Sequence, residues 1–427
     1  MSPDFQSPNL LSYAQAAALI HTHAERLLRE ERRIERVPLG RAAGRVLARP
    51  LVADRDQPSF DRSTRDGFAC RALEATAHAP LPIAGASRAG DSPADPLPAG
   101  AAWEIMTGAA VPPGADAVMM IEHVETIGEP GCQTVRLLPT RTLAAGENIV
   151  IRGSQGRAGD ELLPAGSAMH AAQIALAASC GYAELDVFAR PRAAILATGD
   201  ELVPVDADPA PGQIRNSNSP MLAAFVEEAG GEPLVLPIAA DTAAALDAAL
   251  GQAADSDLLL ITGGVSAGKF DLVEPALLRA GAQFHFTGVR IQPGKPAVLA
   301  EMPRFPATGQ SGTSHFCVGL PGNPVSSAVT FLLFAAPLLA ALAGRRDPGP
   351  RFALAELAGE VRAKPGLTRF LPAACTFGAA GQPPQVQLVS WQGSGDLTAM
   401  GRSNCFLVLD ETTDRLAAST VVRILIP

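Results

Sequence analysis

Between residues 191 and 291, short apolar runs that are typical of buried strands alternate with segments that are typical of helices. The strand-like runs cover residues 193–197, 234–239, 257–262 and 284–291. The helical segments cover residues 220–229, 242–253 and 271–280. Because strands that alternate with helices of this length form βαβ units, this part of the chain predicts a parallel, doubly wound α/β sheet.

Polar or glycine-rich segments follow the ends of these strands. They cover residues 198–201, 240–241, 263–271 and 292–296, and another at 321–326 follows an apolar run at 316–320. In an open parallel sheet, ligands bind at the carboxyl ends of the strands. We call these five segments the rim and predict that they bind a ligand, because unrelated surface loops would not all be polar on one edge.

The loop after residue 262 carries small residues suited to binding an anion, namely Gly263, Gly264, Ser266 and Gly268. Glycines let backbone N–H groups approach the anion, and the N-terminus of the next helix adds a favourable partial charge. A tight strand-to-helix turn explains the same loop equally well, and the spacing does not support an ATPase-type phosphate loop. Lys295 in the next loop is a cation suited to an oxyanion, or alternatively an ordinary solvated lysine.

Three carboxylates in the rim, Glu201, Asp241 and Asp271, follow neighbouring strands. Carboxylates repel an anionic ligand unless a divalent cation lies between them, and Mg²⁺ bound through carboxylates, waters and phosphate oxygens meets this need. Asp241 and Asp271 also precede helices, so an N-cap is the alternative for each. Asp200 and Glu201 cannot both face the site, and the pattern alone does not choose between them.

The remaining segments differ in character. Residues 56–144 carry much Pro and Gly between short apolar runs, which predicts a small β domain inserted into a helical and extended platform of residues 1–55 plus 145–189. Residues 190–344 are the predicted α/β domain, and residues 345–427 predict a further β domain. In the platform, Ser12 and Gln15 form a capping-box pattern for a helix from residue 12 to about 34. His21 and His23 lie on different faces of this helix, so they do not predict a metal pair.

Composition argues against several kinds of partner. The chain has 34 Lys and Arg against 43 Asp and Glu, a formal net charge of −9, so bulk electrostatics do not favour nucleic acid or an anionic membrane surface. The six cysteines lie far apart without a CxxC pair, which indicates a reducing compartment and neither a disulfide framework nor a zinc ribbon. With no secretion signal in the sequence, we expect a cytoplasmic protein. Residues 325–343 are apolar enough to span a bilayer, but a buried helix in a soluble protein has the same composition, and we predict the latter.

Eight segments occur in one order along the chain: PSFDRSTRDGFA, IMTGA, GENI followed by RG, ATGDEL, ITGGVSAGKFD, QPGKP, LPGNPVSSAVTF and QGSGDL. Together they resemble the molybdopterin molybdenumtransferase (MoeA) family, which includes the E domain of gephyrin. The resemblance covers the chain from about residue 10 to its end. It implies an elongated protomer with a helical platform, an inserted β domain, a molybdopterin-binding α/β domain and a C-terminal β-barrel-like domain.

The resemblance also implies an activity, the insertion of molybdate into the dithiolene of adenylylated molybdopterin with Mg²⁺-dependent release of AMP. Members of the family are homodimers, and their cleft is shared between the α/β domain of one subunit and the β domain of the other. An upstream adenylyltransferase and downstream molybdoenzymes are then the expected partners, with no role for nucleic acid or a membrane.

Matching the family's segments residue by residue implies roles for individual side chains. The implied catalytic acids are Asp66, Glu201, Asp241 and Asp271, of which the last three are the implied Mg²⁺ ligands. The implied substrate-binding residues are Thr107, Gly263, Gly264, Ser266, Gly268, Arg290, Lys295, Pro321, Asn323, Pro324 and Ser326. The carboxylates would place Mg²⁺ and a water against the phosphoanhydride, and Lys295 would offset oxyanion charge.

The chain departs from the family pattern at two turns. Gln155 stands where many members carry an acid, and Arg152 alone keeps the positive charge of that turn. Gln292 stands where Lys or Arg is common, with Arg290 as the cation that would compensate. Residues 303–315 resemble an inserted loop.

Two other functions compete with the transferase. A catalytically weakened molybdopterin-binding scaffold is one, because gephyrin-like chains also cluster other proteins and Gln155 replaces an acid. Adenylylation of molybdopterin by a related α/β domain is the other, although the long chain and the form of the glycine-rich loop argue against it.

Overall fold

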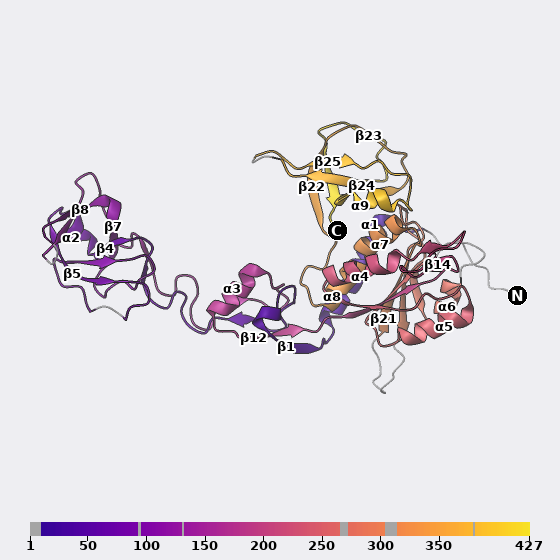
Figure 1. The fold of residues 1–427 in the computed structure, drawn as a ribbon, viewed down its shortest axis with the longest axis horizontal. Helices are drawn as coiled ribbons and strands as arrows, with labels where there is room; N and C mark the ends of the chain where they lie inside the picture. The colour runs from indigo at the N-terminus through magenta and orange to yellow at the C-terminus, as the bar shows by residue number, and fades with distance from the viewer. Residues whose placement is uncertain (1–9, 93–94, 130–131, 265–271, 304–313, 379–380) are drawn as a thin grey trace.

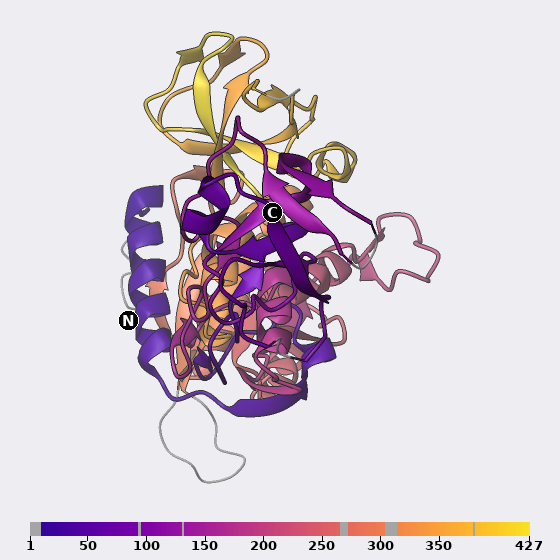
Figure 2. The ribbon, with the colours of Figure 1, turned by 90° about the vertical axis from the view of Figure 1, so that its left-hand side faces the viewer.

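The computed structural model describes residues 10–92, 95–129, 132–264, 272–303, 314–378 and 381–427. The chain is elongated (Figure 1), with a β domain at one end and a small platform in the middle. The α/β domain and the C-terminal β domain lie together at the other end. Viewed after a 90° turn, the C-terminal domain lies above the α/β domain (Figure 2).

Helix α1 (Tyr13–Arg29) begins with the predicted capping box. The N–H of Gln15 donates to Ser12 Oγ at 3.2 Å, and the N–H of Ser12 donates to Gln15 Oε1 at 2.8 Å. The prediction that the helix continues to about residue 34 is wrong, because Ile34 already begins strand β1 (Ile34–Pro38). The buried face of α1 packs into the core of the α/β domain.

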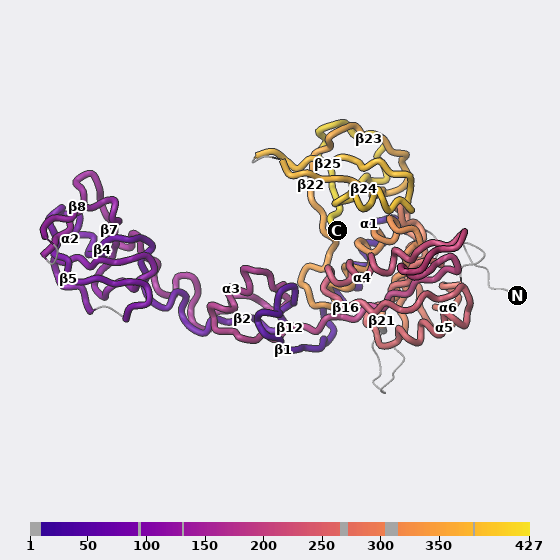
Figure 3. The backbone as a smooth tube through the Cα atoms, in the orientation of Figure 1, coloured from indigo at the N-terminus to yellow at the C-terminus, as the bar shows by residue number. Residues whose placement is uncertain are grey.

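The platform is built from short elements around a small core. Strand β1 pairs antiparallel with β12 (Glu184–Phe188). The remaining elements are η1 (Leu39–Arg41), β2 (Leu51–Val52), β11 (Glu161–Leu163) and α3 (Ala171–Ser179). Leu47, Met169 and Val187 are buried in this core. Figure 3 follows the backbone out of the platform, around the β domain and back.

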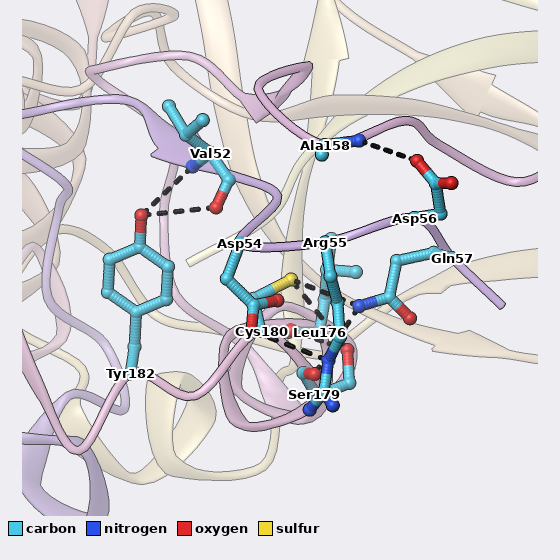
Figure 4. A network of polar contacts seen from close by, with 10 residues as sticks. All are labelled: Val52, Asp54, Arg55, Asp56, Gln57, Ala158, Leu176, Ser179, Cys180 and Tyr182. Carbon is cyan, nitrogen blue, oxygen red and sulfur yellow. Dashed lines mark hydrogen bonds and ion pairs between the residues drawn. The ribbon is translucent and has the colours of Figure 1, made fainter. Parts of the chain in front are cut away.

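Polar contacts fix the point where the chain leaves the platform for the β domain (Figure 4). The Tyr182 hydroxyl accepts from Val52 N–H at 3.1 Å and donates to Val52 O at 3.2 Å. Asp56 accepts from Ala158 N–H at 3.1 Å, which ties the outgoing segment to the returning one. The Gln57 amide contacts the end of α3 through Ser179 O. These bonds hold both connecting segments against the platform.

The β domain is one sheet in the strand order β7-β4-β6-β5-β9-β8. Its strands are β4 (Gly67–Cys70), β5 (Leu81–Ser87), β6 (Ala102–Ile105), β7 (Ala117–Met120), β8 (Val124–Ile127) and β9 (Thr134–Leu137). Short elements beside it are β3 (Arg62–Ser63), α2 (Ala72–Thr76), η2 (Ile121–His123) and β10 (Ile149–Val150). Phe68, Met119 and Val135 are buried in a core of its own.

The α/β domain contains the sheet β16-β13-β17-β21-β20-β18. Its strands are β13 (Arg192–Ala197), β16 (Glu232–Val235), β17 (Leu258–Thr262), β18 (Gln283–Phe286), β20 (Val298–Pro303) and β21 (Ser314–Leu320). Helices α5 (Ala243–Gln252) and α6 (Val273–Arg279) cover one face, and α4 (Asn218–Glu228) covers the other with α1 and the helices after β21. The short pair β14 (Leu202–Val203) and β15 (Ile214–Arg215) lies beside this sheet.

This sheet is mixed rather than wholly parallel. Strands β16, β13, β17 and β21 are parallel as predicted, whereas β20 runs antiparallel to both β21 and β18. The single strand predicted over residues 284–291 is also wrong, because β18 ends at Phe286 and β19 (Ile291–Gln292) joins the C-terminal sheet. An apolar run does not reveal that the chain changes sheets within it.

The apolar segment after β21 is a core helix, as predicted. It consists of α7 (Pro324–Thr330), a π-helical turn η3 (Phe331–Ala335) and α8 (Ala336–Leu342). This described segment is long and apolar enough to span a bilayer, yet 89% of its most apolar window is buried inside the protein. Pro337, which lacks an N–H, lies in the first turn of α8 directly after the π-helical turn.

The C-terminal domain is a curved β sheet in the order β19-β24-β25-β22-β28-β26. Its other strands are β22 (Phe352–Leu357), β24 (Thr368–Thr376), β25 (Gln385–Leu388), β26 (Cys405–Leu409) and β28 (Val421–Leu425). Because β24 also pairs with β26, the sheet closes on itself as a barrel, as predicted. Short β23 (Val361–Arg362), α9 (Leu397–Gly401) and β27 (Arg415–Leu416) complete it.

Candidate functional site

Backbone packing at the carboxyl ends of β13, β17 and β21 requires glycine. At Gly263, where φ is +93°, a Cβ atom would lie 2.4 Å from the carbonyl oxygen of Thr198. A Cβ at Gly322 would lie 3.5 Å from Gly263 Cα, so the turn after β21 contacts the turn after β17. The N–H of Gly263 donates to Leu320 O at 3.2 Å, so the two turns are joined by backbone contacts with no side chain between them.

Asp241 is held in place by the neighbouring strand end. The Thr198 hydroxyl donates to Asp241 Oδ1 at 2.5 Å, and the N–H of Asp241 donates to Asp200 Oδ1 at 3.1 Å. The helix that follows is capped by Thr242, whose hydroxyl accepts from Ala245 N–H at 3.2 Å. The N-cap interpretation of Asp241 is therefore wrong, and its carboxylate belongs to the rim.

Glu201 occupies the same strand end as Asp200 but points elsewhere. Its carboxylate folds back over Gly199, where a Cβ would lie 2.5 Å from Glu201 Oε2. The Asp200 carboxylate instead approaches Asp241. As expected, the two neighbouring acids do not share one direction, and Asp200 is the one that contacts Asp241.

A buried asparagine that the sequence did not single out joins two strand ends. Asn218 in α4 donates from Nδ2 to Thr262 Oγ1 at 2.8 Å and to Gly322 O at 2.7 Å. The residue is 8% exposed, and in the described part of the chain its Oδ1 atom makes no hydrogen bond. The signal in the sequence was the polar run of residues 215–219 before an otherwise apolar helix. Asn218 therefore links two strand ends of the rim, and its Oδ1 atom remains a buried hydrogen-bond acceptor beside them.

The turn after β21 contacts the C-terminal domain. Asn323 donates from Nδ2 to Ser394 Oγ at 2.9 Å, and Val325 N–H donates to Ser394 O at 3.0 Å. Pro324 occupies the first turn of α7, while Pro321 and Ser326 are buried. The QGSGDL segment thus lies beside the rim, although it is far away in sequence.

The loop around Ser394 borders an open cavity of about 690 Å³. Asp396 caps α9 by accepting from Ala399 N–H at 2.9 Å, and it also accepts from Gln392 N–H at 3.0 Å. These backbone hydrogen bonds, with the Ala399 bond contributing most, hold the pKa of Asp396 below its usual value. The loop therefore has a fixed shape next to the rim.

Lys295 lies on an exposed turn at the same edge of the sheet. Strand β20 begins beside the end of β21, with Val298 opposite Gly319, which brings the preceding turn to the rim. Gly294, with φ of +110°, packs this turn on α7, because a Cβ there would lie 2.5 Å from Thr330 Cγ2. Arg290, the proposed compensating cation, instead has its guanidinium 3.8 Å from the Glu411 carboxylate of the C-terminal domain.

Asp66 is positioned entirely within the β domain. Its Oδ1 atom accepts from the Thr107 N–H at 2.6 Å and from the Thr107 hydroxyl at 2.9 Å. The backbone bond and then the side-chain bond hold the pKa of Asp66 below its usual value, so the exposed carboxylate is charged at neutral pH. Within one chain, the β domain lies at the opposite end from the rim (Figure 1), so Asp66 and Glu201 are not brought together.

The turn that departs from the family pattern lies at the base of the β domain. Arg152 donates from its backbone N–H to Asp61 Oδ1 at 2.6 Å and from Nε to Asp56 Oδ2 at 2.7 Å. Gln155 contributes its backbone N–H to Gln57 O at 2.9 Å. Asp56 thus compensates the charge of Arg152, Asp61 holds its backbone, and the turn joins the outgoing and returning segments.

Three family models match the chain in sequence order. They are the MoeA N-terminal region (domain I and II) at residues 11–181, the probable molybdopterin binding domain at 194–341 and the MoeA C-terminal region (domain IV) at 355–426. The molybdopterin molybdenumtransferase of Haemophilus influenzae is 34% identical over 394 residues, which cover 91% of this chain and 93% of that protein. The chain belongs to the MoeA family.

Further relatives of this MoeA-family chain agree with that assignment. A molybdopterin molybdenumtransferase of Nostoc sp. is 37% identical over 316 residues, 73% of this chain and 70% of that protein. The crystal structure of the molybdopterin biosynthesis MoeA protein from Pyrococcus horikoshii OT3 superimposes with a TM-score of 0.78 at 27% identity, covering 98% of this chain and 100% of that one. The predicted family and fold class are confirmed.

Some residues implied by the MoeA resemblance lie outside the described residues. They are Ser266, Gly268 and Asp271 of the glycine-rich loop, together with most of the 303–315 insertion. The N-cap alternative for Asp271 and the anion-binding hypothesis for the loop therefore stay predictions.

The donor chemistry of the described rim fits Mg²⁺. Asp200, Glu201 and Asp241 offer only carboxylate oxygens, which are the ligands that this hard cation prefers. In the described residues these three acids do not close around one point, since their ligand atoms do not all lie within 4.8 Å of one another. Mg²⁺ needs no such cage, because it is commonly held by one or two carboxylates and completes its shell with waters and substrate phosphates.

Proposed function

We propose that this MoeA-family protein inserts molybdate into the dithiolene of adenylylated molybdopterin and releases AMP. In this reaction, Mo–S bonds replace oxygen ligands of molybdate, and water cleaves the phosphoanhydride to give AMP and the molybdopterin phosphate. No electron is transferred. The observation that carries the proposal is the rim, where Asp241 is oriented by Thr198 and not used as a helix cap, directly beside glycine turns that allow close approach of an anion.

The described side chains divide the work of binding and orienting. The backbone N–H of Gly264 would receive a phosphate oxygen, because that of Gly263 already donates to Leu320 O at 3.2 Å, and Lys295 on its exposed turn would offset oxyanion charge. Asp241 and Glu201, with Asp271 of the glycine-rich loop, would hold Mg²⁺. When bound, this ion neutralises charge on the phosphoanhydride. Thr198 fixes the direction of the Asp241 carboxylate, and Asn218 keeps the strand ends rigid.

The elongated shape supports a site completed by a second copy of the chain. Asp66 is charged, exposed and held at the far end of the protomer, where no acid of the rim can reach it within one chain (Figure 1). In a twofold homodimer, the β domain of one subunit would meet the rim of the other, and each of the two sites would take residues from both chains. Asp66 and Thr107 would then face the substrate.

The reaction places this protein between two other activities. An adenylyltransferase must supply the activated molybdopterin, and an apo-molybdoenzyme must receive the product. The acidic composition and the burial of the Pro324–Leu342 helix support a protein that works without nucleic acid or a membrane, in the cytoplasm.

The proposal is tested by AMP release from adenylylated molybdopterin with Mg²⁺ and molybdate. We expect molybdate-stimulated release that falls by about 10²–10³-fold in Asp241→Asn, because the variant keeps the shape but loses the charge. Asp247→Asn is the matched control, since Asp247 lies on the next helix and pairs only on the surface with Arg279 at 2.8 Å.

Other outcomes of the same assay identify the competing functions. Binding of the adenylate without turnover would support the scaffold, and formation of the adenylate from ATP and molybdopterin would support the adenylyltransferase. Equal rates for the wild type and Asp241→Asn would remove Asp241 from the mechanism.

A further inference from the structure

Two histidines and a glutamate meet at the edge of the α/β sheet that lies opposite the rim. They are His23 of α1, His285 of β18 and Glu301 of β20, and one ligand atom from each lies within 4.8 Å of the other two. The imidazole rings of His23 and His285 are 4.3 Å apart between centroids, and His285 Nε2 lies 3.4 Å from Glu301 Oε2. Glu301 is opposite Phe316, near the start of β21, whereas the rim lies at the end of that strand.

Local irregularity in the sheet brings His285 into this group. The pairing of β18 with β20 shifts register between Phe284 and Phe286, so His285 occupies a β-bulge. Phe284 packs with the core on one face of the sheet, and Phe286 packs with the core on the face covered by α1. At the bulge, His285 also faces α1 and contacts His23. Bulges commonly redirect a side chain in this way beside functional sites.

The two imidazoles have nitrogen atoms that protein groups leave unused. In the described part of the chain, the Nε2 atoms of His23 and His285 are both buried and make no hydrogen bond. A buried polar atom that makes no hydrogen bond is unfavourable, so both imidazoles retain an unused coordinating capacity.

We propose that His23, His285 and Glu301 bind a zinc-type divalent cation. Two imidazole nitrogens and one carboxylate oxygen form a ligand set that suits Zn²⁺, with water as the fourth ligand. Tetrahedral zinc ligands at about 2.0–2.1 Å from the metal are roughly 3.4 Å apart, which is the observed separation of His285 Nε2 and Glu301 Oε2. One ring nitrogen of His23 lies within 4.8 Å of the ligand atoms of both other residues.

Arg26 orients the carboxylate ligand. Its Nη2 donates to Glu301 Oε1 at 2.8 Å, and its Nη1 donates to Oε2 at 3.2 Å. Partners of this kind fix the direction of a metal ligand. The positive charge of Arg26 opposes a cation, but Glu30, 3.7 Å from Arg26 Nε, offsets part of it. Removing the guanidinium charge therefore has two opposing effects, and the imidazoles provide the clearer test.

A cation here would fasten α1 to the sheet edge. Helix α1 leads directly into β1 of the platform, which in turn carries the β domain. The cation would thus stabilise the junction between the α/β domain and the rest of the protomer. Because the group lies at the opposite edge from the rim, its occupancy is independent of the proposed transferase activity.

The experiment uses the full-length, tag-free protein after chelator treatment, titrated with Zn²⁺ by calorimetry. Cys132→Ser is the background in all samples, because Cys132 is the exposed cysteine among the described residues. We expect one Zn²⁺ per chain, and at least a tenfold weaker affinity in His23→Ala and in His285→Ala. His21→Ala is the matched control with unchanged affinity, since His21 lies on the exposed face of the same helix and pairs with Glu25.

A second measurement does not need the histidine variants, so it tests the proposal even if a variant fails to fold. Co²⁺ added to the wild-type background should give the intense visible absorption of a four-coordinate site without the charge-transfer bands of thiolate ligands. A weak octahedral spectrum, the absence of stoichiometric Zn²⁺ binding, or full affinity in both folded histidine variants would each overturn the proposal.

Discussion

Asp66 and Asp241 are both exposed acids, but the two regions that carry them hold a carboxylate in different ways. The Asp66 carboxylate accepts two hydrogen bonds from Thr107, within one small domain with its own core. Asp241 accepts from Thr198 at the end of another strand and donates its N–H to Asp200, among glycine turns that pack against one another.

Under the proposed function, these two regions supply different parts of one site. The rim offers several acids, close backbone turns and Lys295, which together suit a phosphate-bearing substrate and a cation. The loop around Asp66 offers one fixed acid and a hydroxyl. A protomer that keeps these regions at opposite ends can combine them only through a second copy, so subunit mixing tests the comparison most directly.

Mixing two inactive variants should restore activity. We expect Asp66→Asn and Asp241→Asn homodimers each to lose about 10²–10³-fold in AMP release. After random exchange of subunits, half of the dimers are mixed, and each mixed dimer has one site with both acids intact. The expected recovery is therefore about a quarter of wild-type activity if the site is shared across a twofold axis.

The control for this experiment is the same mixture without subunit exchange, which should stay inactive. Lack of recovery after proven exchange would place Asp66 and Asp241 in separate functions and would remove the shared site from the proposal.

Much of the fold could be predicted from the sequence because it depends on patterns of neighbouring residues. The alternation of strands and helices after residue 191 identifies the α/β domain, and the Ser12–Gln15 pair identifies the start of α1. Strands β13, β17 and β21, which polar segments follow, are parallel as predicted, so their carboxyl ends lie at one edge of the sheet. Local patterns do not specify partners, which explains why the antiparallel β20 and the transfer of β19 to the C-terminal sheet were missed.

The site shows the same limit. Asn218 looks like an ordinary residue at the start of a helix, and only tertiary contacts with Thr262 and Gly322 reveal that it joins two strand ends. His23 was correctly separated from His21, but its partner His285 is more than two hundred residues away and reaches it through a bulge. Asp241 was ambiguous until Thr242 proved to be the helix cap.

The separate cores of the two regions should give separate unfolding transitions. Met119 is fully buried in the core of the β domain, and Leu260 is fully buried in that of the α/β domain. We expect Met119→Ala to cost roughly 2–5 kcal/mol and to lower only the β-domain transition in calorimetry. Leu260→Ala is the matched control and should lower the other transition. A single transition that both variants shift equally would contradict the independence of the two regions.

The smallest expected effect concerns the hydroxyl that holds Asp66. Thr107→Val removes the side-chain donor but keeps the backbone N–H, so the pKa of Asp66 should rise part of the way toward its usual value. A carboxyl group whose pKa is lower in the folded than in the unfolded state stabilises the fold at pH values above its unfolded-state pKa. This stabilisation is lost as the pH falls through the folded-state pKa. In the variant, the total loss should therefore be smaller and should be complete at a higher pH. Carbon-13 NMR titration of labelled aspartate measures the pKa of Asp66. The control variant Thr107→Ser should retain the wild-type pKa. Identical titrations for Thr107→Val and the wild type would show that the backbone hydrogen bond alone sets the charge of Asp66.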